Sequence, residues 1–237
     1  MLSALLFDLD GTLADTDPIH FQTWRDLLQG YGLEIEPDFY RANFSGRRNQ
    51  EILKDLLPQL SEEASAALSW HKEAEFRVRS QASLVPMAGL AEVLTWTDEQ
   101  HLKRAVVTNA PVENAQFMLQ VLKLEAVFPT VILGDELPCG KPDPLPYQMA
   151  LDRLEVAAHH AIAFEDSPSG IRSAVTAGIL TVGIASTHEP EELYALGTSL
   201  VINDFTDPRL WQLLQQFQMG EITAGVTEWQ RFPSTVS

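Results

Sequence analysis

Short runs of apolar residues recur along the chain and are separated by longer segments with helical periodicity. A run that is apolar throughout and only a few residues long is typical of a strand buried on both faces of a parallel sheet. Such runs occupy residues 2–9, 104–108, 130–133, 161–164, 180–184 and 200–202. Helix-like segments lie between them at residues 112–122, 144–153 and 169–177. Strands and helices that alternate in this way predict βαβ units, and hence an α/β fold with a Rossmann-like parallel sheet.

The alternation is interrupted once, directly after the first run. Four consecutive helical segments follow it, at residues 19–29, 37–43, 49–57 and 61–79. We therefore expect an inserted α-helical cap domain at residues 16–85, within a core domain made of residues 1–15 and 86–219. Short segments near residues 16–18 and 84–86 would be its hinges. A terminal helix at residues 207–218 leaves residues 220–237 as a C-terminal tail.

The composition of the 237 residues excludes several classes of protein. Apolar residues make up 45%, which is enough for a well-buried core. The formal net charge of −17 repels nucleic acid and anionic membranes, so neither is an expected partner. The single cysteine, Cys139, cannot form an intramolecular disulfide, and the N-terminal residues contain no cationic leader. A soluble cytoplasmic protein is expected.

Two carboxylates, Asp8 and Asp10, stand at the end of the first predicted strand. Side chains two residues apart in a strand point the same way, and ligands bind at the carboxyl ends of parallel strands. One carboxylate of such a pair can attack phosphorus, while the other protonates the leaving oxygen and then deprotonates water. Mg²⁺ is the expected counter-ion because it prefers hard oxygen ligands. A simple turn is the alternative, but the position of the Asp-Leu-Asp-Gly-Thr run favours a catalytic site.

Polar residues of suitable type follow three further strands. Thr108 and Asn109 precede a helix whose free N–H groups could bind phosphate together with the Thr108 hydroxyl. Lys141 lies in a proline-rich loop, where it could neutralise both a nucleophile and a phosphate. Glu165 and Asp166 follow the fourth strand and could contribute to a metal site. Each residue alone has an ordinary structural explanation, but the four strand ends together indicate one site.

The predicted insertion contains a basic cluster, Arg41, Arg47 and Arg48, in a chain with only 16 lysines and arginines. On a lid these side chains could bind a phosphate or sugar hydroxyls, whereas on an ordinary surface they would be solvated. His20 shares a helix face with Trp24, and it either binds substrate or packs the insertion. We take Arg47 and His20 as the candidate substrate-binding residues of the insertion.

These motifs resemble those of haloacid dehalogenase superfamily phosphatases. The segments FDLDGTLADTDPIH, VVTNAP, CGKPDP and FEDSPSGIRSAVTAG carry the resemblance. Within the superfamily, the chain is similar to the branch of β-phosphoglucomutase, phosphoglycolate phosphatase and small sugar-phosphate phosphatases. Residues 106–214 look closest to plant enzymes that dephosphorylate small sugar phosphates and phosphoglycerol. The resemblance implies a Mg²⁺-dependent, monomeric enzyme with a small helical cap that acts on a small phosphorylated metabolite.

The resemblance also implies a role for each matched position. Asp8 would be the nucleophile and a Mg²⁺ ligand, and Asp10 would be the acid/base with its backbone carbonyl on the metal. Thr108 and Lys141 would hold the phosphoryl group, and Asp166 would complete the metal site. A dehalogenase is disfavoured, because dehalogenases of this superfamily lack an acid at the place of Asp10.

Three functions are compatible with the sequence. The first, and our prediction, is a phosphatase of small sugar or polyol phosphates that works through an aspartyl-phosphate. The second is a mutase of the β-phosphoglucomutase type, which returns the phosphoryl group to a bound intermediate instead of to water. The run Asn109-Ala110-Pro111 departs from the pattern of that mutase. The third is a phospho-receiver module without turnover, in which Asp10 would have no role.

Overall fold

The computed structural model describes residues 1–219, which contain a six-stranded parallel sheet. Its strands lie in the spatial order β3-β2-β1-β4-β5-β6. They are β1 (Ala4–Phe7), β2 (Lys103–Thr108), β3 (Thr130–Leu133), β4 (Ala161–Glu165), β5 (Leu180–Ile184) and β6 (Leu200–Ile202). The strand order reverses beside β1, and sheets of this kind bind ligands at the carboxyl ends of the strands at that point.

The central position of β1 explains why its sequence is apolar without interruption. All its residues are buried, because β2 and β4 flank the strand and helices cover both faces. Successive side chains enter different clusters, so that Leu5 and Phe7 pack on one side of the sheet and Leu6 packs on the other. The ring of Phe7 stacks on Phe164 of β4 with 4.9 Å between centroids. The strand thereby fixes the residue that follows it at the middle of the carboxyl edge.

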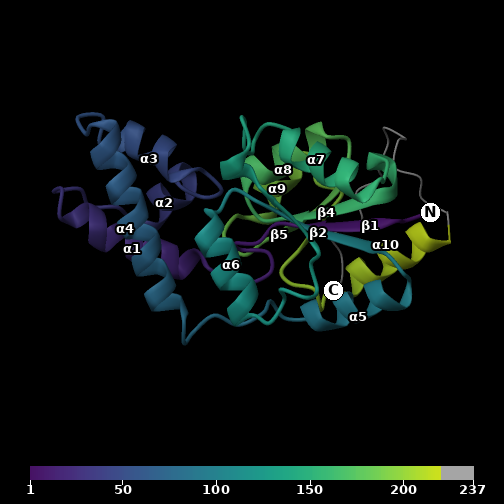
Figure 1. Cartoon of the computed structure of the whole chain (residues 1–237). Coiled ribbons are helices and arrows are strands. Elements are labelled where there is room, and N and C mark those ends of the chain that lie inside the picture. Colours follow the sequence, from purple (N-terminus) through teal and green to yellow (C-terminus); the bar gives the residue numbers. More distant parts are fainter. Residues whose placement is uncertain (220–237) are drawn as a thin grey trace.

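Helices cover both faces of the sheet (Figure 1). On one face lie α5 (Leu90–Glu99), α6 (Val112–Val121) and α10 (Pro208–Gln218). On the other face lie α7 (Leu145–Leu154), α8 (Pro168–Thr176) and α9 (Pro190–Ala195). Two short 3₁₀ turns, η1 (Gly134–Glu136) and η2 (Ala158–His160), belong to the connections. This three-layer arrangement covers the faces of the sheet but not the carboxyl ends of its strands.

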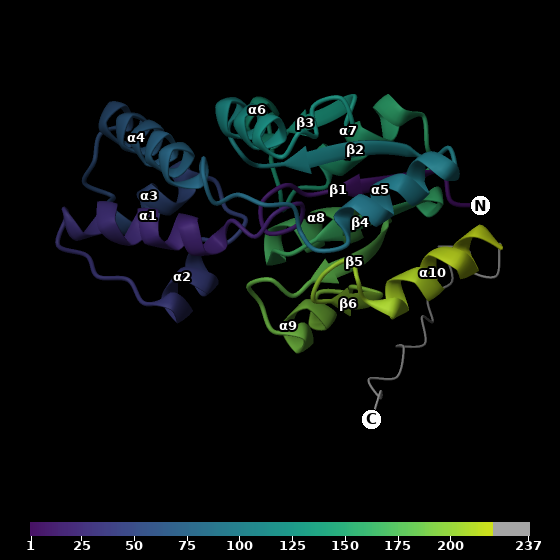
Figure 2. The ribbon, with the colours of Figure 1, turned by 90° about the horizontal axis from the view of Figure 1, so that it is seen from below.

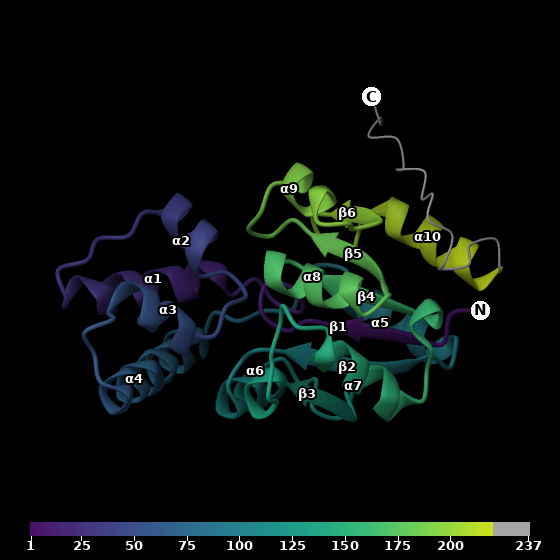
Figure 3. The same cartoon turned by 90° about the horizontal axis from the view of Figure 1, so that it is seen from above.

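Four helices between β1 and α5 gather beside the carboxyl edge of the sheet (Figures 2 and 3). They are α1 (Asp17–Gln29), α2 (Pro37–Asn43), α3 (Asn49–Leu56) and α4 (Glu62–Ser80). We refer to residues 17–80 as the insertion. Its apolar side chains form a cluster separate from those of the sheet, with Trp24, Leu28, Tyr40, Phe44 and Leu53 among its members. The insertion therefore has a small core of its own.

The fold class expected from the sequence is confirmed. The predicted strands at residues 130–133, 180–184 and 200–202 and the predicted helix at residues 37–43 have the observed bounds, and the other predicted elements differ by one or two residues at their ends. Two helices, α5 and α9, are missing from the prediction. The six residues of α9 are too few for a periodic pattern, whereas the buried residues of α5 do follow helical spacing.

Two further expectations are not tested by the fold. The division into core and cap at residues 15/16 and 85/86 stays a prediction, although the separate apolar cluster of the insertion is compatible with it. The tail at residues 220–237 lies outside the described residues. Within residues 1–219, every helix is too short or too polar to cross a membrane.

Candidate active site

Three neighbouring strands bring the predicted site residues together at the carboxyl edge of the sheet. Asp8 follows β1, Thr108 ends β2, and Glu165 ends β4 with Asp166 directly after it. The loop between η1 and α7 carries Lys141 to the same place. All five side chains belong to buried residues. The site is therefore built where the strand order reverses.

The ammonium group of Lys141 lies between two carboxylates. Its Nζ donates to Oδ1 of Asp8 and to Oε1 of Glu165, each at 2.5 Å. The hydroxyl of Tyr147 donates to the same Glu165 oxygen at 2.6 Å. Only 2% of the Lys141 side chain is exposed, so water cannot replace these partners. Lys141 is thus fixed beside the Asp8 carboxylate.

Burial and mutual repulsion change the protonation of this cluster. Burial raises the pKa of Asp8 to about 8, against the lowering effect of Lys141. Burial and the nearby charge of Asp8 raise the pKa of Asp166 well above its usual range. Burial acts to lower the pKa of Lys141, but Asp8 and Glu165 outweigh it and hold that pKa above its ordinary value. If all these carboxylates were ionised, they would carry more negative charge than one ammonium group can balance, which is why the pKa values of Asp8 and Asp166 are raised.

The donor set at this point fits a divalent cation. One oxygen from each of Asp8, Glu165 and Asp166 lies within 4.8 Å of the others. Carboxylate oxygens are hard ligands of the kind that Mg²⁺ prefers. Oε1 of Glu165 is already bound by Lys141, and Oε2 of Glu165 is packed against Gly170 in α8. Asp8 and Asp166 are therefore the two carboxylates best placed to bind the ion.

The turn that follows Asp10 approaches Asp166 very closely. Gly11 has a φ of 74°, in the left-handed region that favours glycine. A Cβ atom on this residue would lie 2.2 Å from Oδ2 of Asp166. Glycine at this position thus allows the loop of Asp8 and Asp10 to close over the Asp166 carboxylate.

Asp10 is held by side chains at the start of the insertion. Its Oδ1 accepts hydrogen bonds from the Thr16 hydroxyl at 2.9 Å and from Nε2 of His20 at 3.2 Å. The ammonium group of Lys72 lies 2.8 Å from Nδ1 of the same histidine. An ammonium group can only donate, so Nδ1 accepts and the ring proton is on Nε2, where it faces Asp10. Lys72 and His20 together therefore orient the Asp10 carboxylate.

Glu73, next to Lys72 in α4, is the centre of a second buried network. Its Oε1 accepts from Lys72 at 2.8 Å and from Asn49 at 2.5 Å, and its Oε2 accepts from the amide of Asn114 in α6. Burial acts to raise the pKa of Glu73, but the charge of Lys72 and the hydrogen bonds from Lys72 and Asn49 outweigh it and lower that pKa to about 2. Glu73 is accordingly ionised at neutral pH.

Thr108 and Asn109 are engaged mainly by the backbone. Oγ1 of Thr108 accepts from the N–H of Ala110 at 2.9 Å, which leaves its own hydroxyl hydrogen available to a ligand. The amide of Asn109 accepts from the N–H of Lys141 and donates to its carbonyl, each at 3.0 Å. It also donates to the carbonyl of Gly46 at 3.2 Å. Asn109 thus fixes the Lys141 loop and leaves little capacity for a substrate.

The two adjacent arginines of the insertion have different surroundings. Arg47 donates to Asp55 at 2.7 Å and to the carbonyl of Asn43 at 3.0 Å, both within the insertion. Arg48 reaches out of the insertion and donates to the carbonyl of Gly134. Its Nε is buried and has no hydrogen-bond partner. Arg48 thus joins the insertion to the segment after β3, whereas Arg47 is engaged within the insertion.

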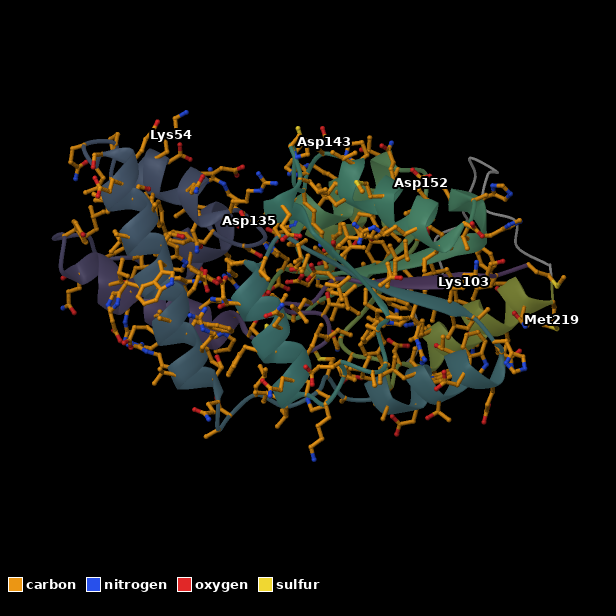
Figure 4. All side chains as sticks on the ribbon, viewed as in Figure 1. Lys54, Lys103, Asp135, Asp143, Asp152 and Met219 are labelled. Carbon is orange, nitrogen blue, oxygen red and sulfur yellow. The ribbon has the colours of Figure 1, made fainter. Side chains whose placement is uncertain are left out.

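A cavity of about 130 Å³ lies between the insertion and the carboxyl edge of the sheet. Asp8, Asp10, Thr108, Asn109, Lys141 and Asp166 line it from the sheet side, and His20, Arg47, Arg48, Lys72 and Glu73 line it from the insertion. Figure 4 shows Asp135, another lining residue, where the two parts meet, and Lys54 at the outer side of the insertion. The predicted site residues all line this cavity except Glu165, which is fully buried against Lys141.

Several residues of the cavity are absent from the sequence-based prediction. Lys72 and Glu73 are both buried in α4. A signal for Lys72 was present, because it shares a helix face with Phe76 and a lysine on an apolar face indicates a buried ammonium group. Asn114 gave no such signal, since a polar residue near the start of a surface helix is ordinary.

Comparison with known proteins points to a single family. The model of the family described as haloacid dehalogenase-like hydrolase matches residues 5–184. A phosphorylated carbohydrates phosphatase from Thermotoga maritima is 33% identical over 180 residues, which are 75% of this chain and 82% of that protein. A validoxylamine A 7′-phosphate phosphatase from Streptomyces hygroscopicus subsp. limoneus is 30% identical over 209 residues, which are 88% and 97% of the two chains.

Solved structures share the fold at lower identity. The crystal structure of β-phosphoglucomutase from Clostridium difficile superimposes with a TM-score of 0.81 and 22% identity, covering 93% of this chain and 99% of that one. At that identity the likeness concerns the fold alone. It places the four-helix insertion and the parallel sheet in a known architecture.

Proposed function

Because the chain belongs to the haloacid dehalogenase-like hydrolase family, we propose that it is a Mg²⁺-dependent phosphatase of small sugar or polyol monophosphates. The reaction would proceed through an aspartyl-phosphate on Asp8. The proposal rests above all on the buried Asp8 carboxylate, which Lys141 holds at 2.5 Å beside the cavity. Relatives named as phosphatases of phosphorylated carbohydrates and of validoxylamine A 7′-phosphate support the substrate class.

Asp8 acts as the nucleophile in the first step. A carboxylate oxygen forms a bond to phosphorus as the bond between phosphorus and the substrate oxygen breaks. Lys141 favours the ionised form of the carboxylate and offsets the negative charge that gathers there. The hydroxyl of Thr108 and the free N–H groups at the start of α6 bind the phosphoryl oxygens.

Asp10 carries the protons of both steps. It donates a proton to the leaving oxygen of the substrate, and its carboxylate then takes a proton from the water that attacks the aspartyl-phosphate. That attack breaks the bond between phosphorus and Asp8 and releases inorganic phosphate. The bonds from Thr16 and His20 keep Asp10 directed at the reacting oxygen.

Asp8 and Asp166 would hold the Mg²⁺ ion, with Glu165 nearby and with the backbone carbonyl of Asp10 as the further ligand that the family resemblance implies. When bound, the ion neutralises the charge of the phosphate and of the carboxylates in contact with it. This assignment accounts for a buried group of carboxylates in which burial raises the pKa of Asp8 to about 8.

The insertion, together with the short segments that flank it, forms a cap domain at residues 16–85 that covers the site. The core domain consists of residues 1–15 and 86–219. A closed cap excludes bulk water from the cavity during phosphoryl transfer. His20, Lys72 and Arg48 contact the remainder of the substrate, and Arg47 is the alternative that the sequence favours. Asn109 acts by fixing the Lys141 loop. The enzyme works as a monomer on a small phosphorylated metabolite in the cytoplasm.

The test is the release of inorganic phosphate from a panel of sugar and polyol monophosphates, with Mg²⁺ and with EDTA. Release that requires Mg²⁺ is the expected result. Absence of release from every monoester, at high enzyme concentration, contradicts the proposal. The mutase alternative uses the same core residues and predicts that β-glucose 1-phosphate is converted to glucose 6-phosphate without free phosphate. A receiver module does not fit a chain that belongs to a hydrolase family.

A further inference from the structure

Asn114 belongs to α6 on the sheet side, yet both ends of its amide bind the insertion. Its Nδ2 donates to Oε2 of Glu73, and its Oδ1 accepts from Nη1 of Arg77 at 2.5 Å. The exposed fraction of Asn114 is only 1%. A carboxamide suits this pair because one end donates to the carboxylate and the other accepts from the guanidinium. Although Asn114 lines the cavity, both of its polar groups are thus engaged by α4.

Glu73 and Arg77 are four residues apart in α4, with the acid on the N-terminal side. This spacing and orientation are the ones that favour an ion pair within a helix. Among the described residues no ion pair joins the two, and the amide of Asn114 bonds to both instead. If the insertion moves away from the sheet, the two side chains are free to pair with each other. The contact with Asn114 therefore belongs to the closed arrangement.

The contact with Asn114 is also connected to Asp10. Oε1 of Glu73 binds Lys72, Lys72 donates to Nδ1 of His20, and Nε2 of His20 donates to Asp10. The hydrogen bonds thus run from α6 through the insertion and back to the loop after β1. A change at one end alters the position of α4 and with it the side chains that orient Asp10.

We propose that Asn114 is a positioning residue that holds the insertion closed through Glu73 and Arg77. By doing so it places Lys72 and His20 against Asp10. This inference rests on the proposed function, since it concerns how the acid/base of that reaction is oriented. It assigns no direct contact between Asn114 and the reacting atoms.

Replacing a residue that holds the insertion closed changes the fraction of molecules in the closed state more than it changes the rate of reaction in that state. If the competent state is populated only in part, the apparent affinity for substrate falls by that fraction. Loss of the contact should therefore raise KM more than it lowers kcat. A merely structural defect would instead reduce the amount of active enzyme, which lowers kcat and leaves KM unchanged.

The first experiment exchanges the two chemical groups of the contact. Asn114→Asp sets a carboxylate against Glu73, and we expect KM for the best sugar phosphate to rise roughly tenfold, in the usual range for coupled sites. Adding Glu73→Gln supplies an amide that donates to the new carboxylate and still accepts from Lys72 and Asn49. The double variant should return KM to within about threefold of the unmodified chain. Gln116→Glu, the same change of amide to acid at an exposed position further along α6, is the control and should leave KM unchanged.

The second experiment measures closure without turnover. The exposed residues Trp70 in α4 and Gln120 in α6 are replaced by cysteine (Trp70→Cys and Gln120→Cys) and spin-labelled. Cys139→Ser first removes the native exposed thiol. Asn114→Asp should broaden the distance distribution toward longer values, and adding Glu73→Gln should reverse this. An unchanged distribution in Asn114→Asp, or a double variant with a KM as high as that of the single one, overturns the inference. Because the distances need no substrate, they decide the inference even if no monoester is hydrolysed.

Discussion

Nζ of Lys141 lies 2.5 Å from Oδ1 of Asp8, although 133 positions separate the two residues in the sequence. The contact arises because the strand before Asp8 lies at the centre of the sheet and the Lys141 loop returns to the carboxyl edge. The same ammonium group bonds to Glu165, so one cation serves two buried carboxylates. The Lys141 ammonium group therefore contributes both to the stability of the site and to its proposed chemistry.

Lys141→Met should both inactivate and destabilise the protein. Removing the cation leaves two buried carboxylates without their partner. Breaking a buried ion pair in this way lowers the free energy of unfolding by about 3–5 kcal/mol. Urea unfolding in EDTA measures this loss. Lys54→Met, at an exposed position of α3, is the matched control and should change stability by less than about 0.5 kcal/mol. Equal stability of the two variants would show that the Lys141 contacts contribute little.

The parts of the site that the sequence predicts are those with local signals. Asp8, Thr108 and Asp166 each lie at the end of a short apolar run or just after it, and the carboxyl ends of parallel strands meet at one edge, so their proximity follows from the pattern. The family and the fold expected from the sequence are confirmed. The assignment of roles to individual residues stays a prediction.

The insertion was harder to predict because its residues meet through tertiary packing. Arg47 and Arg48 are neighbours in the sequence, and only the backbone conformation directs one to Asp55 and the other to the carbonyl of Gly134. Asn114 binds α4 across the boundary between insertion and sheet, and no pattern of residues within α6 predicts such a contact. Helical periodicity predicts which residues share a face, but not which faces meet.

Gly46→Ala should impair closure of the insertion. A Cβ atom at Gly46 would lie 2.4 Å from the hydroxyl oxygens of Ser167 and Ser169, so the loop could not keep its place. Gly32→Ala is a matched control within the insertion, because Gly32 has a φ of 74°, close to the 69° of Gly46, and no atom within 4 Å of the added carbon. Both variants carry a similar backbone strain of about 1 kcal/mol.

Steady-state kinetics on a sugar phosphate separates the effects of these two variants. Gly46→Ala should lower kcat/KM by roughly tenfold or more, whereas Gly32→Ala should lower it by less than about twofold. A similar loss in both variants would mean that strain, and not contact with the serines of α8 and its N-cap, limits activity.

Arg48→Met should weaken substrate binding more than Arg47→Met. Arg48 lines the cavity and bonds out of the insertion to the carbonyl of Gly134, whereas Arg47 is engaged within the insertion by Asp55 and the carbonyl of Asn43. A lost hydrogen bond to a charged group costs about 1.5–3 kcal/mol, so KM should rise by roughly tenfold or more in Arg48→Met. The KM values of the two variants for one sugar phosphate test which arginine contributes more to substrate binding. A larger rise in Arg47→Met contradicts this assignment.

Asp17→Asn should increase the free energy of unfolding at neutral pH and change it little in acid. Burial raises the pKa of Asp17 to about 6, against the lowering effect of the hydrogen bond from Tyr40, and its Oδ2 has no hydrogen-bond partner. The folded state therefore holds a proton that the unfolded state has already lost, and stability falls as pH rises from about 4 to about 6. Above that window the ionised carboxylate costs ~1–3 kcal/mol, and an amide avoids this cost.

Urea unfolding at pH 4 and at pH 7.5 measures this difference. Asn retains an oxygen that can accept the hydrogen bond of 2.9 Å from the Tyr40 hydroxyl, so the comparison isolates the charge. A difference between Asp17→Asn and the unmodified chain that is the same at both pH values would show that Asp17 titrates alike in the folded and unfolded states.

The most direct test of the account is to trap the phosphoryl group on the chain. Asp10→Asn removes the base that activates water, and p-nitrophenyl phosphate needs no acid for its leaving group, so the phosphorylated enzyme should accumulate. After an acid quench, mass spectrometry should find one phosphoryl group on the peptide that contains Asp8. It should be present with Mg²⁺ and absent with EDTA or after adding Asp8→Asn. A phosphoryl group on another residue, or none while the unmodified chain turns over, would contradict Asp8 as the nucleophile.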